Sequence, residues 1–325
     1  MKSAKNPAPG TPDAAGLAGA RTAARPGRAG ATSSGWRWPG VASVIAVVAL
    51  LGLGLGMYPT VAAWYTQVDQ SRVISNSVAR MDDDPAANAE ALRLAHQYNE
   101  ALISGAVLDS GARIPTGNGT AATTLQYKNL LVDPLTGVLA RLRIPKIDLD
   151  LPVYHGTSDA TLLKGLGHLE GTSLPVGGVG THAVITGHRG LASATMFTRL
   201  NELAAGDTFS IETQAEVLSY RVVRTQVVDP DQTQSLEAVP GKDLVTLVTC
   251  TPIGINSQRI LVTAERVFPT IASDIAAAHA VPNIPGFPWW AVILGGGFLL
   301  LALYVWRAGY PPKRREKALA VDSSE

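Results

Sequence analysis

The sequence predicts a mainly β domain, either a closed barrel or a sandwich, that lies between two segments able to cross a membrane. Seven stretches rich in Val, Ile, Leu and Thr follow one another between residues 137 and 267, and Gly and Pro clusters separate them. Two long apolar segments flank this region. Short strands with turn residues between them are typical of barrels and sandwiches. The expected strands are 138–144, 149–153, 182–186, 208–212, 217–229, 245–250 and 258–267.

The chain before the β region begins with a polar tail and a first apolar segment. Residues 1–40 are rich in Ala, Gly, Pro and Ser, so we expect a disordered cytoplasmic tail. Residues 41–64 follow, and Ser43 is the only clearly polar residue in the N-terminal part of this segment. The segment is predicted to be a transmembrane anchor. Ala62 and Ala63 leave a cleaved signal peptide as the alternative.

The second apolar segment, residues 287–306, contains no charge and has the length of about 20 residues that spans a bilayer. A basic tail, residues 307–325, follows it, and the first segment is likewise preceded by basic residues. Because positive charge favours the cytoplasmic side, both termini are expected in the cytoplasm and residues 65–286 outside. The basic residues near the two spans are Lys2, Lys5, Arg21, Arg25, Arg28, Arg37, Arg307, Lys313, Arg314, Arg315 and Lys317.

Residues 65–136 are expected to form a helical extension with a loop. Asp84 is a candidate N-cap, Pro85 the first residue of a helix, and Gly105 its end. Residues 106–124 have no sustained periodicity, and so long a loop is interpreted as a lid. Apolar side chains recur at helical spacing at Leu92, Ala95, Tyr98 and Leu102.

Residues 137–268 are assigned to the β domain, and residues 269–286 to a linker that leads to the second span. Three short helices are predicted in and before the β domain, at 125–131, 161–166 and 195–203. The glycine-rich stretch 165–170 breaks the dinucleotide-binding fingerprint and is interpreted as a turn.

Composition excludes several classes of function. With 27 basic and 26 acidic residues the net charge is +1, so no basic field exists to bind nucleic acid. A single cysteine excludes an intramolecular disulfide and a zinc site built from several thiolates. No two of the six histidines have the spacing of a zinc protease. Neither a metal nor another cofactor is expected.

The single cysteine, Cys250, ends a strand-like run that Thr251 and Pro252 stop. Nine residues later Arg259 lies in another strand-like run, so the two strands can place a cation beside the sulfur. His188 follows a further predicted strand. A thiol can attack a carbonyl, an imidazole can protonate a leaving amine, and a guanidinium can stabilise an oxyanion.

Each of these residues also has an ordinary interpretation. Free cysteine is among the most buried residue types, so Cys250 can be an inert core thiol. His188 can belong to a surface turn, and Arg259 can be a solvated strand arginine. The three together, with the thiol at a strand end where a side chain can reach solvent, favour the nucleophilic site.

The motifs resemble those of the sortase family. The cysteine strand 246–250 with Arg259 resembles the sortase signature, and 186–190 resembles its histidine segment. The resemblance covers about residues 70–268 and is greatest to the class C sortases, which polymerise pilins. Four further segments carry this class C resemblance: 144–147, 151–157, 167–175 and 251–256.

The resemblance implies a closed eight-stranded β-barrel with an N-terminal helical extension and a lid. Cys250 would attack the Thr–Gly bond of an LPXTG-like sorting signal and form a thioester. His188 would act as acid and base, and Arg259 would hold the substrate and stabilise the oxyanion. The lysine amine of a neighbouring pilin would then release the acyl group as an isopeptide bond. The implied partners are pilin or surface-protein sorting signals, the lysine acceptor and the cell membrane.

One departure concerns the lid. Class C lids often carry an Asp-Pro-aromatic tripeptide over the cysteine, whereas this loop has Asp109, Ser110 and Gly111 without an aromatic residue. Asp109 and Ser110 are therefore candidate lid residues. Two other functions stay open: a sortase that anchors proteins to peptidoglycan, and a non-catalytic, membrane-anchored binding domain.

Overall fold

The β domain is a closed barrel of eight strands in the order β1-β2-β3-β4-β7-β8-β6-β5, which confirms the barrel and excludes the sandwich. The structure, a computed structural model, describes residues 35–81, 84–105, 126–214, 216–278, 280–282 and 285–310. The strands are β1 (Val138–Ile144), β2 (Leu149–His155), β3 (Leu166–His168), β4 (Thr181–Thr186), β5 (Thr208–Thr213), β6 (Glu216–Val228), β7 (Asp243–Thr251) and β8 (Gln258–Arg266).

The α-helices are α1 (Gly40–Met81), α2 (Pro85–Gly105), α3 (Asp159–Lys164), α4 (Ala272–Ala277) and α5 (Trp289–Ala308). Four single 3₁₀ turns complete the described elements: η1 (Tyr127–Asn129), η2 (Pro145–Ile147), η3 (Leu200–Glu202) and η4 (Gln234–Leu236).

All seven predicted strands are present, and an eighth, β3, lies in the stretch 165–170 that was expected to be a turn. With three residues it is too short for periodicity to reveal. It follows α3 and pairs in parallel with β2 and antiparallel with β4. β3 therefore closes the sheet between two longer strands.

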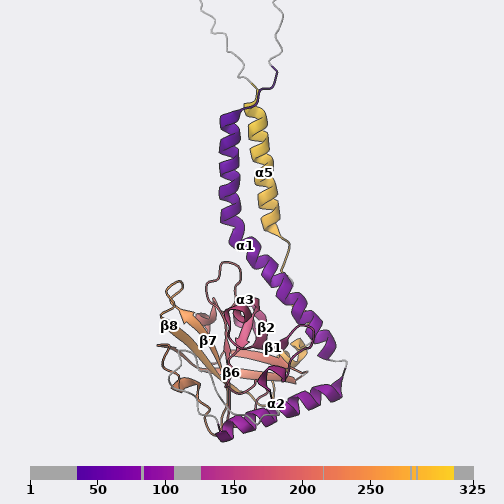
Figure 1. Ribbon diagram of the computed structural model, residues 1–325, viewed down its shortest axis with the longest axis vertical. Coiled ribbons are helices and arrows are strands. Elements are labelled where there is room, and N and C mark those ends of the chain that lie inside the picture. Colours follow the sequence, from indigo (N-terminus) through magenta and orange to yellow (C-terminus); the bar gives the residue numbers. More distant parts are fainter. Residues whose placement is uncertain are drawn as a thin grey trace, which may run out of the picture.

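Helix α1 is much longer than the predicted anchor. Its 42 residues run without interruption past Pro59, a length of roughly 63 Å at about 1.5 Å per residue. Only about 30 Å of this can lie in the hydrocarbon of a bilayer. Figure 1 shows that α1 changes direction between its upper part, beside α5, and its lower part, which reaches the barrel. A proline inside a helix removes one hydrogen bond and bends the axis, and Pro59 lies near the middle of α1.

Helices α1 and α5 are long and apolar enough to cross a membrane, and they lie side by side (Figure 1). Almost none of their most apolar windows is buried inside the protein, 6% for α1 and 0% for α5. Hydrogen bonds join the pair at both ends. The Trp36 Nε1 donates to the Trp306 carbonyl (3.1 Å), and the Trp64 Nε1 donates to the Gly286 carbonyl (3.1 Å). Such a pair of helices is typical of a membrane anchor.

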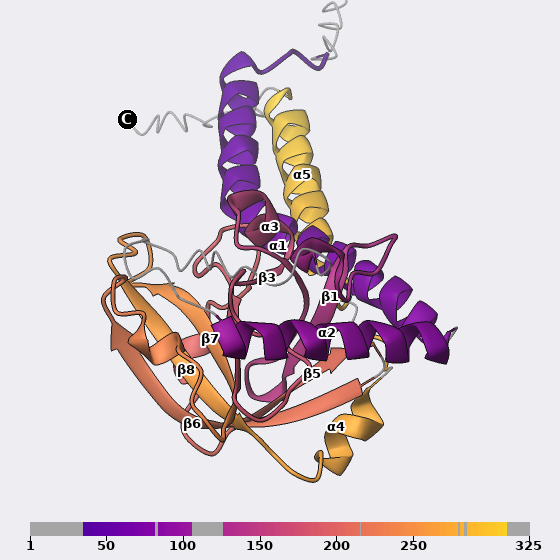
Figure 2. The ribbon, with the colours of Figure 1, turned by 60° about the horizontal axis from the view of Figure 1, so that its bottom comes forward.

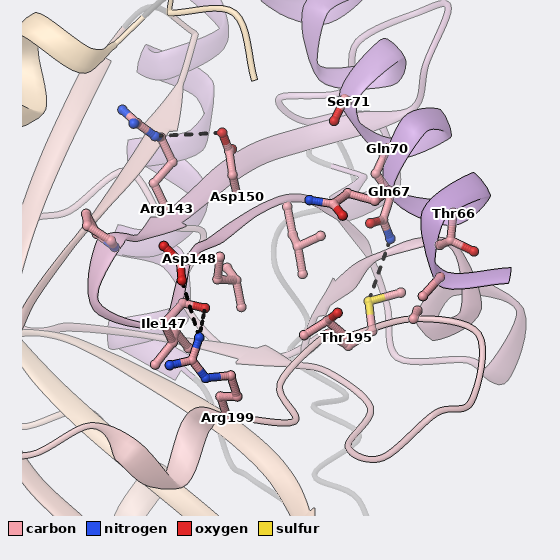
Figure 3. A pocket seen from close by; sticks show the side chains of 16 residues that line it. Thr66, Gln67, Gln70, Ser71, Arg143, Ile147, Asp148, Asp150, Thr195 and Arg199 are labelled. Carbon is pink, nitrogen blue, oxygen red and sulfur yellow. Dashed lines mark hydrogen bonds and ion pairs between the residues drawn. The ribbon is translucent and has the colours of Figure 1, made fainter. Parts of the chain in front are cut away.

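The lower part of α1 packs on the barrel and contacts β1 and β2. The Gln70 side chain, 5% exposed, donates from Nε2 to the Lys164 carbonyl (3.0 Å) and lies 3.7 Å from the Met196 sulfur. Figure 3 shows this contact in a cavity of about 390 Å³ between α1 and the barrel. Near the end of α1, Arg80 binds both carboxylate oxygens of Asp133. The anchor helix is therefore fixed to the domain.

The Asp84 N-cap and the helix from Pro85 are confirmed, because the Asp84 carboxylate accepts from the Ala87 amide (3.0 Å). Helix α2 lies across the barrel (Figure 2) and buries Tyr98 and Leu102 in the main core. Asn99 exchanges two hydrogen bonds with the Leu174 backbone, at 3.0 and 2.7 Å. These contacts hold α2 against the loop between β3 and β4.

The structure agrees with the three predicted short helices to different extents. Helix α3 is present but ends at Lys164, where the chain enters β3. Of 125–131, the structure shows η1, and residue 125 lies outside the described residues. The prediction of a helix at 195–203 was wrong, because the segment contains only η3. Met196 adopts a φ of 39°, and the Arg189 guanidinium binds the Thr198 carbonyl. The linker after the barrel contains α4.

Two buried histidines, His168 and His182, predict how the stability of the fold depends on pH. His168 is fully buried, its Nε2 donates to the Ser173 carbonyl (2.8 Å), and desolvation lowers its pKa to about 4. Burial also lowers the pKa of His182. In the unfolded chain a histidine takes up a proton near pH 6.5, whereas folded His168 stays neutral down to about pH 4. The free energy of unfolding therefore has its full value above pH 6.5 and decreases as the pH falls to 4. His168 alone accounts for a decrease of about 3 kcal/mol.

Thermal unfolding of the full chain in nanodiscs between pH 7.5 and 4.5 measures this effect. We expect Tm to fall steadily over that range, and a His96→Gln variant on α2 should follow the same curve. A Tm that stays level or rises on acidification would contradict the assignment of neutral buried histidines.

Candidate active site

The barrel strands β4, β7 and β8 carry apolar side chains on both faces. Inward residues such as Ile185, Leu247 and Ile260 belong to the main core. On the opposite face, Val184, Val248 and Leu261 form a second apolar cluster with Leu169 and Leu236. This outer face is where the candidate catalytic residues lie, because side chains alternate along a strand.

Cys250 and Arg259 are direct partners across the antiparallel β7 and β8 ladder. Directly opposed residues share one face of a sheet, so thiol and guanidinium lie on the same side. The Arg259 Nη1 donates to the Asn256 carbonyl of the connecting loop and to the Gln258 carbonyl at the start of β8, both at 2.9 Å. These bonds orient the guanidinium, and no carboxylate of the described residues forms an ion pair with it.

His188 reaches the same place through the parallel pairing of β4 with β7. Thr186, the last residue of β4, pairs with Val248, so the chain leaves β4 two residues before His188 and next to the end of β7 that carries Cys250. Two hydrogen bonds extend the pairing beyond β4. The Gly187 amide donates to the Val248 carbonyl (3.1 Å), and the Thr249 hydroxyl donates to the Gly187 carbonyl (2.7 Å).

The loop after His188 is braced by residues that the sequence analysis did not identify. The Arg189 guanidinium donates to the Thr251 hydroxyl (2.8 Å), next to Cys250, and to Asn201 (2.9 Å). Gly187 is required by close packing, because a Cβ there would lie 2.6 Å from Leu166 Cδ2. The motif around His188 therefore contains one candidate catalytic residue and several that hold it in place.

Cys250, His188 and Arg259 line one cavity of about 280 Å³ on the outer face of the barrel. The apolar cluster forms its floor. Its walls come from the segment between β6 and β7 and from α3 with the loop before it. The wall residues are Thr157, Asp159, Leu162, Asp229, Pro230, Gln232 and Thr233.

The arrangement brings a nucleophile, a proton carrier and a permanent cation to the edge of an apolar groove. Cys250 is a free thiol and is partly exposed. In the part of the chain that the structure describes, no side-chain hydrogen bond holds the His188 ring, so both nitrogens can serve a ligand. Such a set can perform acyl transfer by way of a covalent intermediate.

The remaining residues considered in the sequence are the lid candidates and His182. Asp109, Ser110 and the whole predicted lid, residues 106–124, lie outside the described residues. His182 lies on the outer face of β4, beside Val184 of the cavity lining, but both of its ring nitrogens are bonded inside the protein. Its Nδ1 donates to the Glu237 carbonyl (2.8 Å), and its Nε2 accepts from the Thr246 hydroxyl (2.7 Å). His182 is therefore a structural residue.

Gln70 connects the anchor helix to α3, which lines this cavity, and to the loop that follows His188. It binds the last residue of α3, a wall of the groove, and contacts Met196 in the loop that follows His188 (Figure 3). A neutral hydrogen bond contributes about 1 kcal/mol, so we expect Gln70→Ala to lower kcat/KM roughly fivefold. The measurement is peptide cleavage by the full chain in nanodiscs, with Tm recorded alongside. The exposed neighbour variant Gln67→Ala should keep full activity, and equal activity of both variants would contradict the prediction.

Comparisons with known proteins agree with this geometry. A sortase domain model matches residues 142–267. Sortase D of Bacillus subtilis (strain 168) is 33% identical over 155 residues, which cover 46% of this chain and 75% of that protein. Among solved structures, sortase A of Corynebacterium diphtheriae is 42% identical with a TM-score of 0.52, covering 63% of this chain and 93% of that one. Sortase C of Streptococcus pneumoniae is 37% identical with a TM-score of 0.53, covering 62% of this chain and 98% of that one.

The barrel topology, the shared cavity of the cysteine, histidine and arginine, and the likeness over most of these relatives' length lead to one conclusion. This chain belongs to the sortase family of cysteine transpeptidases.

Proposed function

We propose that this protein is a pilin-polymerising transpeptidase. It cleaves an LPXTG-like sorting signal between Thr and Gly and transfers the threonyl group to a lysine amine of a pilin. The observation that carries the proposal is the common cavity of Cys250, His188 and Arg259, open to an apolar groove.

The proposed reaction has two acyl transfers. The Cys250 thiolate attacks the Thr carbonyl, a sulfur–carbon bond forms, and the Thr–Gly carbon–nitrogen bond breaks as His188 protonates the glycine amine. The lysine amine then attacks the thioester and gives a proton to His188, and the thiolate leaves. Arg259 donates to the oxyanion of each tetrahedral intermediate. The apolar floor takes the Leu-Pro part of the signal and keeps water from the thioester.

Substitution of Arg259 tests its role. Arg259→Ala should lower kcat/KM by about 10²- to 10³-fold, the usual cost of losing one oxyanion donor. Arg259→Lys keeps the charge but loses the planar guanidinium, whose Nη1 donates to two backbone carbonyls, so it should recover only part of the rate. Peptide cleavage kinetics measure both variants. Arg221→Ala, on the exposed surface of β6, is the matched control, and an Arg259→Ala enzyme as active as this control would refute the role.

The membrane arrangement is part of the proposal. Helices α1 and α5 cross the membrane together, both termini lie in the cytoplasm, and the barrel lies outside. Aromatic clusters support this placement, with Trp64, Tyr65 and Trp290 in contact at the barrel end of the two helices. Labelling of introduced cysteines with a membrane-impermeant reagent, in a Cys250→Ser background, tests the topology, and labelling of residue 36 from outside would overturn it.

The choice of acceptor separates the two sortase functions. The likeness to the Streptococcus pneumoniae enzyme, which has pilin substrates, and the second membrane helix favour pili. The likeness to proteins named sortase A and sortase D keeps anchoring to peptidoglycan as the second candidate. We would give the full chain in nanodiscs a sorting peptide together with either a lysine-bearing pilin domain or a peptidoglycan cross-bridge peptide. Isopeptide product from the first supports the proposal, and a preference for the second would replace it.

A further inference from the structure

A second cavity, of about 440 Å³, adjoins the catalytic one along the outer face of the barrel. Gly180 and His182 line the second cavity, whereas Val184, Thr186 and His188 line the first. His182, Val184 and Thr186 alternate along β4 and share one face, and Gly180 and His188 lie just beyond its two ends. Leu236, at the end of η4, lines both cavities. The two cavities are therefore consecutive parts of one groove along β4.

The groove is longer than a sorting motif. The segment from 180 to 188, which contains β4 and the residues that flank it, spans at most about 26 Å at about 3.3 Å per residue. An extended five-residue motif covers about 17 Å of this by the same measure. Room remains for up to about three more residues of extended peptide.

The chemistry of the first cavity fixes which end of the peptide enters the second. In the proposed reaction Cys250 bonds the threonine carbonyl, and the apolar Leu and Pro precede that threonine. The apolar side chains of the groove, Val184, Leu169 and Leu236, lie on the side of Cys250 that faces the second cavity. The substrate residues upstream of the motif thus continue toward His182.

The second cavity offers apolar surface. Leu102 and Ile103 of α2 form one side, with Ile103 53% exposed, and Ala238 and Pro240 form the other. Glu237 is the charged residue in the described lining.

The polar groups of the floor have partners within the protein. The Ser173 hydroxyl accepts from the His182 amide (3.2 Å), and the Thr172 hydroxyl donates to the Leu169 carbonyl (2.7 Å). An apolar side chain gains from burial there, whereas an acidic one would lose hydration and face Glu237.

We propose that this second cavity binds the substrate residues immediately upstream of the sorting motif and selects an apolar side chain among them. The inference rests on the proposed function, since it needs a sorting peptide in the first cavity. It makes Ile103 a specificity-determining residue that lies outside the catalytic machinery.

The test compares three sets of peptides with the full chain in nanodiscs. The first set is a panel of LPXTG peptides that begin at Leu, the second adds Ala-Val-Ala before it, and the third adds Ala-Asp-Ala. The measured quantity is kcat/KM for release of the glycine fragment. We expect the apolar extension to raise kcat/KM about tenfold through a lower KM, the gain from burying one aliphatic side chain. The acidic extension should give no gain.

Two substitutions of Ile103 tie the effect to the cavity. Ile103→Asp should remove the gain from the apolar extension without changing the rate on the short peptides, and Ile103→Lys should instead improve the acidic peptide. Val223→Asp, at an exposed position of β6 outside both cavities, should behave as the parent protein.

The two proposals fail in different ways. If no peptide of any set is cleaved, the proposed function itself is refuted. If the short peptides are cleaved but extension and the Ile103 variants change nothing, the upstream site is refuted and the catalytic proposal stands.

Discussion

Replacement of Cys250 by alanine is expected to abolish both peptide cleavage and isopeptide formation, with a loss of at least about a thousandfold in kcat. The thiol is the proposed site of the only covalent bond between enzyme and substrate, and the described cavity contains no second nucleophile that can form a thioester. Cys250→Ser keeps the shape of the side chain but replaces a readily ionised thiol with a hydroxyl, so it should be almost as inactive. Cleavage kinetics and the intact mass after incubation with a sorting peptide measure the effect.

The control for this prediction is the structure of the variant. Cys250 lies at the end of β7 and is only partly buried, so Cys250→Ala should change Tm little and should still bind the peptide. In the parent protein an acyl adduct should appear on Cys250. A Cys250→Ala protein that cleaves at the parent rate would remove the nucleophile from the proposal, and with it the thioester.

The pairing of Cys250 with Arg259 could be predicted because it is local. Two strand-like runs separated by a short turn form a hairpin, and the register opposes these two residues directly. The position of His188 was harder to predict, because it depends on the parallel pairing of β4 with β7. These two strands are distant in sequence. Only the recurrence of a known motif, and not strand periodicity, indicated that the histidine would reach the thiol.

The missed features all depend on tertiary contacts. The sequence pattern at 195–203 favours a helix, but Arg189 binds the Thr198 carbonyl and Asn201, which holds the segment as a loop. The end of the apolar pattern predicted an anchor that stops at residue 64, whereas contacts of Gln70 and Arg80 with the barrel domain favour a continuous α1. The second cavity could not be predicted, because it joins α2, the β3–β4 loop and the β6–β7 segment.

Replacement of His188 by glutamine is expected to lower kcat/KM for an amide substrate by about 10²- to 10⁴-fold, the usual contribution of a positioned acid and base. The glycine amine is a poor leaving group until it gains a proton, and the structure places His188 in the same cavity as Cys250, with no described side-chain hydrogen bond on its ring. A substrate whose leaving group needs no proton should depend less on this residue. The same sorting peptide made as a nitrophenyl ester at threonine provides that comparison, because its phenolate leaves unaided.

The His188→Gln enzyme should therefore lose much less activity on the ester than on the amide, since the ester still requires the thiol but no longer requires the acid. The matched control is His96→Gln, at a half-buried position of α2 outside the cavity, which should retain the parent rate on both substrates. Equal losses on amide and ester would show that His188 does not protonate the leaving group and acts, if at all, by maintaining the thiolate. The comparison thus separates proton transfer to the glycine amine from activation of Cys250, two roles that the common cavity allows equally well.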